Sequence, residues 1–221
     1  VDYSLHTVRM HYEDAPIIVF ENGSNELKEV CDNHHASYVQ QPLNYMKPPG
    51  NQQYAMISDF DILFEHMCRV SAMAHEHNVK WVVYLEPDVI LKRKISGFPE
   101  ADIGASLHAF NRFNSTTYEL IQNQNGSTKS TDRYGFQGGA IASLRAFKLA
   151  CSNVSVWQTA TAHALAQSSD TGICCGDMFQ SMVFLLLGFE IEDWKEHCEL
   201  HIHDEERVTG AAVAHGFKKY Y

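Results

Sequence analysis

Residues 81–91 read WVVYLEPDVIL, an apolar run interrupted by two carboxylates. A short run rich in β-branched and aromatic residues predicts a buried strand, with Glu86 and Asp88 at its tip. Pro87 fixes φ between them and pushes Glu86 toward an extended conformation, so both side chains leave the strand on the same side. Two hard oxygen ligands with open coordination positions suit Mg²⁺ or Mn²⁺. The same residues are equally compatible with a strand that runs into an acidic turn.

The composition is that of a globular α/β protein. The chain has 221 residues, 45% of them hydrophobic and 11% aromatic, which is enough for one core. Its formal charge of −10 argues against a nucleic acid as partner. The longest apolar run, 182–189, is far shorter than the roughly 20 residues of a membrane helix, so no membrane span is expected.

The cysteines and glycosylation sequons bear on the compartment. Six cysteines are scattered without a C-x-x-C pair, which argues against a zinc ribbon or a dense disulfide scaffold, and most are expected to be reduced. One of four Asn-x-Ser/Thr sequons begins at Asn22, beside the expected ligand pocket. A glycan there would block the pocket, which favours the cytoplasm over the secretory lumen.

The first half of the chain alternates helical and strand patterns. A helix over 4–12 leads into a buried strand over 15–20, and a second brief strand follows at 38–41. An α/β sheet normally opens on a strand, so the opening helix indicates that a first strand is missing or lies upstream.

A clear amphipathic helix, capped by Ser58, runs to about residue 77 and leads into the central strand. Its first turn holds Asp59 and Asp61, a literal D-x-D pattern and a rival to Glu86 and Asp88. Positions i and i+2 of a helix point about 200° apart, so these two acids do not easily share one ion. We interpret them as partners of the helix dipole.

Beyond the central strand, a strand over 101–108 precedes a polar stretch, through residue 131, that is typical of a loop. Helices are expected over 134–149 and 156–166. A strongly apolar helix then begins at 176 and ends at Gly188, and a strand over 189–194 follows.

Three histidines, His197, His201 and His203, lie close together in the sequence and invite a metal site. Acidic residues surround them, however, and such a composition indicates a solvated acidic surface.

The order of these elements predicts a mostly parallel sheet that binds its ligand along the carboxyl edge. Several segments together resemble the GT-A glycosyltransferases of the inverting, family-2-like type. Residues 17–24, IIVFENGS, are similar to that family's VVDDGS or VVDNGS segment, whose acidic residue contacts the uracil ring. The resemblance implies this role for Glu21, one methylene longer than the usual Asp, with Asn22 beside it.

The glycines and acids of the later motifs extend the resemblance. Glu86-Pro87-Asp88 is similar to the family's DxD motif, which implies that Asp88 ligates the metal and that Glu86 faces the ribose or sugar. Gly138 and Gly139 look like the glycine pair that lets the backbone approach the donor sugar or acceptor.

The last two motifs lie in the C-terminal third. Gly176-Asp177 resembles the ED motif, which implies that Asp177 is the catalytic base, although this chain has Gly where the family often has Glu. His215-Gly216-Phe217-Lys218 resembles a C-terminal element, in which the His completes the metal site and the Lys contacts the diphosphate.

Taken together, the resemblance implies one GT-A domain over 1–221, with a nucleotide-binding part at about 1–95 and an acceptor part at about 96–221. It implies a Mn²⁺- or Mg²⁺-dependent hexosyltransferase that moves a sugar from a UDP-sugar to a hydroxyl of a glycan or protein-linked acceptor, with inversion. Two alternatives stay open: a pyrophosphorylase-like nucleotidyltransferase, and an inactive domain that binds a sugar nucleotide or glycan. Asp177 also fits an ordinary helix start, and His215 an ordinary terminal histidine.

Overall fold

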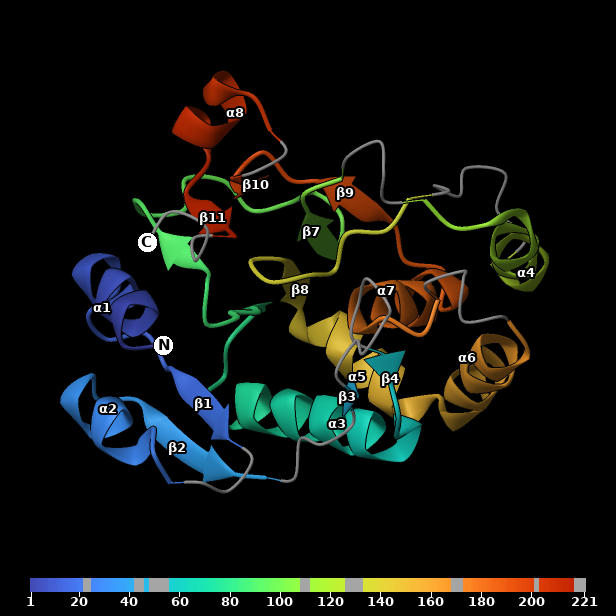
Figure 1. Cartoon of the computed structure of the whole chain (residues 1–221), viewed down its shortest axis with the longest axis horizontal. Helices are drawn as coiled ribbons and strands as arrows, with labels where there is room; N and C mark the ends of the chain where they lie inside the picture. Colours follow the sequence, from blue (N-terminus) through green and yellow to red (C-terminus); the bar gives the residue numbers. More distant parts are fainter. Residues whose placement is uncertain are drawn as a thin grey trace.

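The computed structural model describes residues 1–21, 25–41, 46–47, 56–107, 112–125, 133–167, 173–200 and 203–216. Helices and strands alternate along the described chain (Figure 1). In order they are α1 (Asp2–His11), β1 (Ile18–Glu21), α2 (Lys28–Asn33), β2 (Ser37–Gln40), β3 (Met46–Lys47), β4 (Met56–Ile57), α3 (Phe60–Glu76), β5 (Trp81–Val83), β6 (Ile90–Leu91), β7 (Ile103–Ala105), α4 (Ser115–Asn125), β8 (Ile141–Ser143), α5 (Leu144–Ser152), α6 (Val154–Ala166), α7 (Gly176–Leu186), β9 (Ile191–Asp193), β10 (His197–Glu199), α8 (Glu205–Gly210) and β11 (Val213–His215).

The largest sheet has four strands in the order β5-β8-β7-β9. Strand β8 runs antiparallel to both of its neighbours, whereas β7 and β9 are parallel. Smaller parallel pairs join β1 to β2 and β10 to β11. The expectation of an α/β fold is confirmed, but the described sheets are small and mixed rather than mostly parallel.

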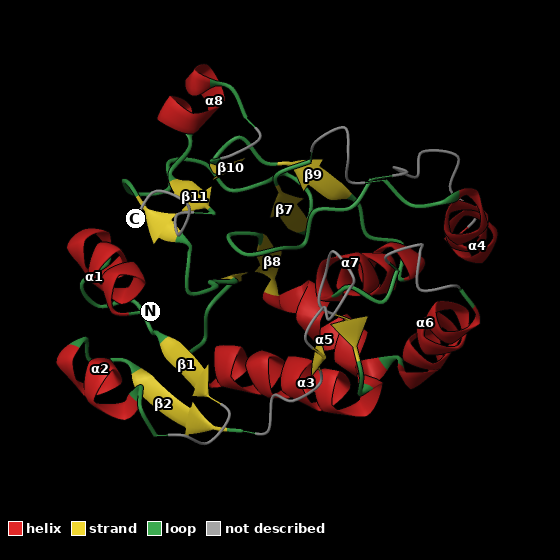
Figure 2. Ribbon diagram, in the orientation of Figure 1, coloured by secondary structure: helices red, strands yellow, loops and turns green. Residues whose placement is uncertain are grey.

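Helices α3, α5, α6 and α7 gather beside the four-stranded sheet and enclose the main core (Figure 2). Helix α7 is buried on nearly all sides, as its strongly apolar sequence requires. The rings of Phe136, Phe147 and Phe184 pack edge to face, and all three are almost completely buried. Such aromatic packing fixes α5 and α7 against the loop that precedes β8.

The opening helix α1 has a definite place in the structure. It packs against β6, close to β11 and β1 (Figure 1). Ser4 Oγ donates to the carbonyl of Pro87 at 2.9 Å, and Thr7 Oγ1 accepts from the Leu91 N–H at 3.1 Å. The first hydrogen bond holds the centre of the acidic turn that follows β5, and the second holds β6 directly after it.

Three expectations for the elements were wrong. Ile141–Ser143 forms β8 rather than part of a helix, because its backbone pairs with strands on both sides. The stretch expected to be a loop contains α4, whose Thr117 and Ile121 are buried against the core. Asp59, not Ser58, caps α3, since its side chain accepts from the Asp61 and Ile62 N–H groups. This capping role agrees with the expected interaction of Asp59 with the helix dipole.

Two further features concern the whole described chain. All six cysteines are free thiols, and Cys31 and Cys198 are buried. Within the described ranges, no helix is both long enough and apolar enough to span a membrane.

Candidate active site

The acidic motif occupies a tight turn after β5, which is an edge strand of the described four-stranded sheet rather than the central strand expected. Pairing with the strand beside it continues past β5, since the Tyr84 N–H donates to the Ala140 carbonyl at 2.8 Å. The Val89 N–H then donates to the Glu86 carbonyl at 3.0 Å and closes a turn with Pro87 and Asp88 at its centre. Proline suits the first central position of such a turn because its φ is fixed near the required value. Both carboxylates therefore project from one rigid turn.

Strand pairing brings His215 to this turn from the other end of the chain. Strand β6 begins directly after the turn and pairs antiparallel with β11, with Ile90 opposite Ala214. The next residue of β11 is His215. Its Nε2 lies 3.5 Å from Glu86 Oε2 and 3.7 Å from Asp88 Oδ1.

These three side chains fit a divalent cation. Their ligand atoms all lie within 4.8 Å of one another. Ligands held about 2.1 Å from Mg²⁺ are about 3.0 Å apart when adjacent and about 4.2 Å apart when opposite. Two carboxylate oxygens and one imidazole nitrogen also suit Mn²⁺. His215 Nε2 lies 3.5 and 3.7 Å from the two carboxylates, between these two values, so the three side chains are close enough to ligate one ion.

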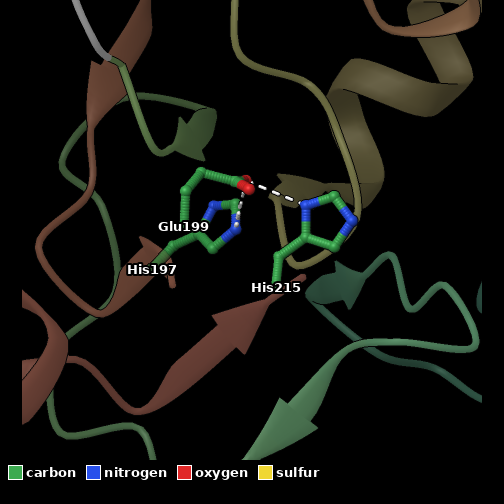
Figure 3. A group of neighbouring side chains, drawn as sticks. All are labelled: His197, Glu199 and His215. Carbon is green, nitrogen blue, oxygen red and sulfur yellow. Dashed lines mark hydrogen bonds and ion pairs between the residues drawn. The ribbon is translucent and has the colours of Figure 1, made fainter. Parts of the chain in front are cut away.

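A further carboxylate, that of Glu199, contacts the other ring nitrogen of His215. Glu199 lies opposite His215 on the paired strand β10, and its Oε1 is 2.9 Å from His215 Nδ1. Figure 3 shows the Glu199 carboxylate between the rings of His197 and His215. Gln137 Nε2 donates to the same oxygen at 2.6 Å. Glu199 is only 3% exposed, so these contacts take place away from solvent.

The pKa values follow from this packing. Burial alone would lower the pKa of His215, but its hydrogen bond to Glu199 and its interaction with Glu86 raise the pKa to about 10. Burial acts to raise the pKa of Glu199, but the hydrogen bond and charge of His215 outweigh it and lower the pKa. The pair is therefore an imidazolium and a carboxylate near neutral pH when no metal ion is bound.

His197, Glu199 and His215 also form a compact group of potential ligands, but His197 does not fit a metal. Its Nδ1 accepts a hydrogen bond from the Ser106 N–H at 3.0 Å, so that nitrogen carries no proton. Burial lowers the pKa of His197 to about 4, and its single proton therefore sits on Nε2. A protonated nitrogen cannot ligate a metal ion.

The expectation of a solvated acidic surface around residue 197 fits Asp204, Glu205 and Glu206, which are exposed, but it was wrong for His197 and Glu199. His197 and Glu199 are buried, and two neighbouring acids are paired individually. Glu196 binds Arg93 at 2.7 Å, and Asp193 binds Arg207 at 3.0 Å. The sequence analysis did not identify Glu199 as a site residue, because its acidic neighbours suggested a solvated surface. His201 lies outside the described residues.

Asp177 lies in the first turn of α7, and the charges of Glu86, His215 and Glu199 act on its carboxyl group. Burial raises the pKa of its carboxyl from 3.8 to about 7, and the charge of Glu86 adds to this shift. His215 acts in the opposite direction, and Glu199 raises the pKa further. Asp177 is thus within electrostatic reach of the turn that carries Glu86, although the two are 91 positions apart in the sequence.

The two glycines pack against site residues. A Cβ on Gly138 would lie 3.0 Å from the side chain of Glu86. Gly139 has φ +96°, and its Cβ would lie 2.6 Å from His197 Nε2. The expected helix does not begin at this pair. The glycines instead let the strand that follows approach the two side chains closely.

Of the remaining residues that the sequence analysis named, one lies on a separate sheet and two lie outside the described residues. Glu21 ends β1, and its Oε2 accepts a hydrogen bond from the Tyr38 hydroxyl on β2 at 2.7 Å. It thus lies on the separate β1–β2 pair. Asn22 and Lys218 lie outside the described residues. The structure therefore brings together Glu86, Asp88 and His215, and the charges of Glu86 and His215 act on Asp177.

Replacing Gly139 with Ala should destabilise the fold strongly. The positive φ costs a residue with Cβ about 1–2 kcal/mol, and overpacking against His197 adds about 1–3 kcal/mol. Gly188, at φ +83° with nothing within 4 Å of its Cβ position, is the matched control for backbone strain alone. Urea unfolding of Gly139→Ala and Gly188→Ala measures both. Equal losses of stability would contradict the close packing on His197.

Replacing Asp177 with Asn should stabilise the protein in a pH-dependent way. Native Asp177 keeps its proton up to about pH 7, whereas the unfolded chain releases it near 3.8, so the free energy of unfolding falls as pH rises between these values. Asn cannot ionise. The melting-temperature advantage of Asp177→Asn, measured with a chelator present, should grow from pH 4 to pH 7 and then stay constant. An advantage that shrinks over this range would contradict the assignment.

Comparison with known proteins gives support at the level of the fold. No protein-family model matches the sequence, and no curated protein sequence matches it. Among solved structures, the chain is similar to a crystal structure of an active-site mutant of LgtC, a glycosyltransferase. The TM-score is 0.51 at 13% sequence identity, over 97% of this chain and 81% of the LgtC chain. The chain therefore has a mixed α/β fold similar to that of the LgtC structure.

Proposed function

We propose that this chain is a metal-dependent glycosyltransferase that moves a sugar from a nucleotide-diphosphate donor to an acceptor hydroxyl. The observation that carries the proposal is the convergence of Glu86, Asp88 and His215 from two distant segments onto one point. A fold similar to that of a glycosyltransferase supports it at the coarse level.

The donor would bind at the turn after β5. Glu86, Asp88 and His215 would hold Mn²⁺ or Mg²⁺, which stabilises the negative charge of a departing diphosphate. Glu21, on the β1–β2 pair, would contact the base of the nucleotide, and a uridine donor follows from the sequence resemblance. Lys218 is proposed as a further contact to the diphosphate.

Asp177 is the proposed general base. Its carboxyl would accept the proton of the acceptor hydroxyl as that oxygen attacks the anomeric carbon, and transfer would then proceed with inversion. A base works best when its pKa is close to the pH of the reaction, and the raised pKa of Asp177, about 7, meets this condition.

Two substitutions should separate donor binding from chemistry. Asp88→Asn should weaken Mn²⁺-dependent binding of a UDP-sugar, because a metal ligand is lost. Asp177→Asn should retain that binding and lower the transfer rate about 10²- to 10⁴-fold, because a proton acceptor is lost. Calorimetry with UDP-sugars, followed by assay of released nucleoside diphosphate, measures both effects.

The rival D-x-D pattern supplies a matched control. Asp61, exposed in the first turn of α3, should tolerate Asp61→Asn with unchanged binding and turnover. Unchanged turnover in Asp88→Asn, or loss of activity in Asp61→Asn, would contradict the proposed site. Formation of a nucleoside triphosphate from a sugar nucleotide and pyrophosphate would instead indicate a nucleotidyltransferase.

A further inference from the structure

Two N–H groups form hydrogen bonds with one oxygen of Glu199, and a third lies just beyond hydrogen-bond distance. Gln137 Nε2 donates to Oε1 at 2.6 Å, and His215 Nδ1 lies 2.9 Å from it. His197 Nε2, which carries the proton of that ring, lies 3.6 Å away. The two hydrogen-bond donors, Gln137 and His215, stabilise the carboxylate form, which only accepts hydrogen bonds. The proton between Glu199 and His215 therefore sits on His215 Nδ1.

This arrangement decides which nitrogen of His215 can bind an ion. A neutral imidazole has one protonated nitrogen and one lone pair. With the proton held on Nδ1 by Glu199, the lone pair is on Nε2, the atom that faces Glu86 and Asp88. A carboxylate that accepts from the second nitrogen of a ligating histidine fixes both its tautomer and its ring orientation.

Glu199 is itself held in place by its surroundings. Its backbone N–H donates to His203 Nδ1 at 2.9 Å, and strand pairing sets it opposite His215. Behind it, the ring of His197 is fixed by the Ser106 N–H. The carboxylate therefore has little freedom to turn away from His215.

We propose that Glu199 is the positioning residue of the cation site. It holds the proton of His215 on Nδ1 and presents Nε2 to a divalent ion, together with Glu86 and Asp88. This inference rests on the proposed function, because it takes the ion to be bound at that point. It adds a buried carboxylate that the sequence motifs do not include.

The first test compares Mn²⁺ affinity, measured by calorimetry without substrate, in four proteins: wild type, Glu199→Gln, Glu196→Gln and Asp88→Asn. Loss of a carboxylate behind a ligating histidine typically weakens metal binding about 10- to 100-fold, and we expect this for Glu199→Gln. Glu196 is the matched control, since it is buried in the same segment but bound to Arg93. Glu196→Gln should keep the wild-type affinity.

The outcomes separate the inference from the proposed function. Wild-type affinity in Glu199→Gln, with weakened binding in Asp88→Asn, would overturn the role of Glu199 and leave the cation site standing. Wild-type affinity in both variants would overturn the cation site itself. Equal weakening in Glu199→Gln and Glu196→Gln would show a general loss of structure and would also overturn the specific role.

A second measurement needs no variant at position 199. Nitrogen NMR shifts of the His215 ring, recorded on the wild-type protein with Mg²⁺ bound and assigned with His215→Gln, report which nitrogen carries the proton. The inference predicts a proton on Nδ1 and none on Nε2. A proton on Nε2 in the Mg²⁺-bound protein would overturn it, even if Glu199→Gln fails to fold.

Discussion

The site depends on the balance of charge around His215. Glu86 and Asp88 lie on one turn, Glu199 lies on β10, and Asp177 lies on α7, and the charge of each carboxyl acts on this one imidazole. Two pKa values are raised in these surroundings: that of His215 to about 10 and that of Asp177 to about 7. Both shifts reduce negative charge. A divalent cation would serve the same purpose, which is the physical reason for expecting one here.

Backbone pairing, rather than side-chain contacts alone, assembles this cluster. Strand β6 follows the acidic turn directly, and β11 lies between β6 and β10, so one small sheet carries His215 and Glu199 to Asp88. Helix α1 contacts this turn through Ser4 and strand β6 through Thr7. The geometry of the site therefore depends on contacts between both ends of the described chain and its middle.

The sequence analysis named Glu86, Asp88 and His215 as candidates, and the structure places these three side chains close together, while their roles stay proposals. Glu86 and Asp88 could be noticed because they follow an apolar strand, whereas Asp177, at the start of an apolar helix, was singled out by the resemblance to the ED motif. Glu199 was missed because its neighbours are acidic, and pairing with distant arginines is invisible in a local pattern. Strand β8 was missed because three residues are too few to set a period. The resemblance to GT-A enzymes agrees with the fold similarity to LgtC, whereas the small, mixed sheets depart from the mostly parallel sheet expected.

The most direct test of the central claim is a crystal structure with Mn²⁺ and UDP, with anomalous scattering data collected at the manganese absorption edge. The account predicts one strong anomalous peak bounded by Asp88 and by Nε2 of His215, with the diphosphate on its open side. A peak elsewhere, with His215 still paired to Glu86 and Glu199, would contradict it.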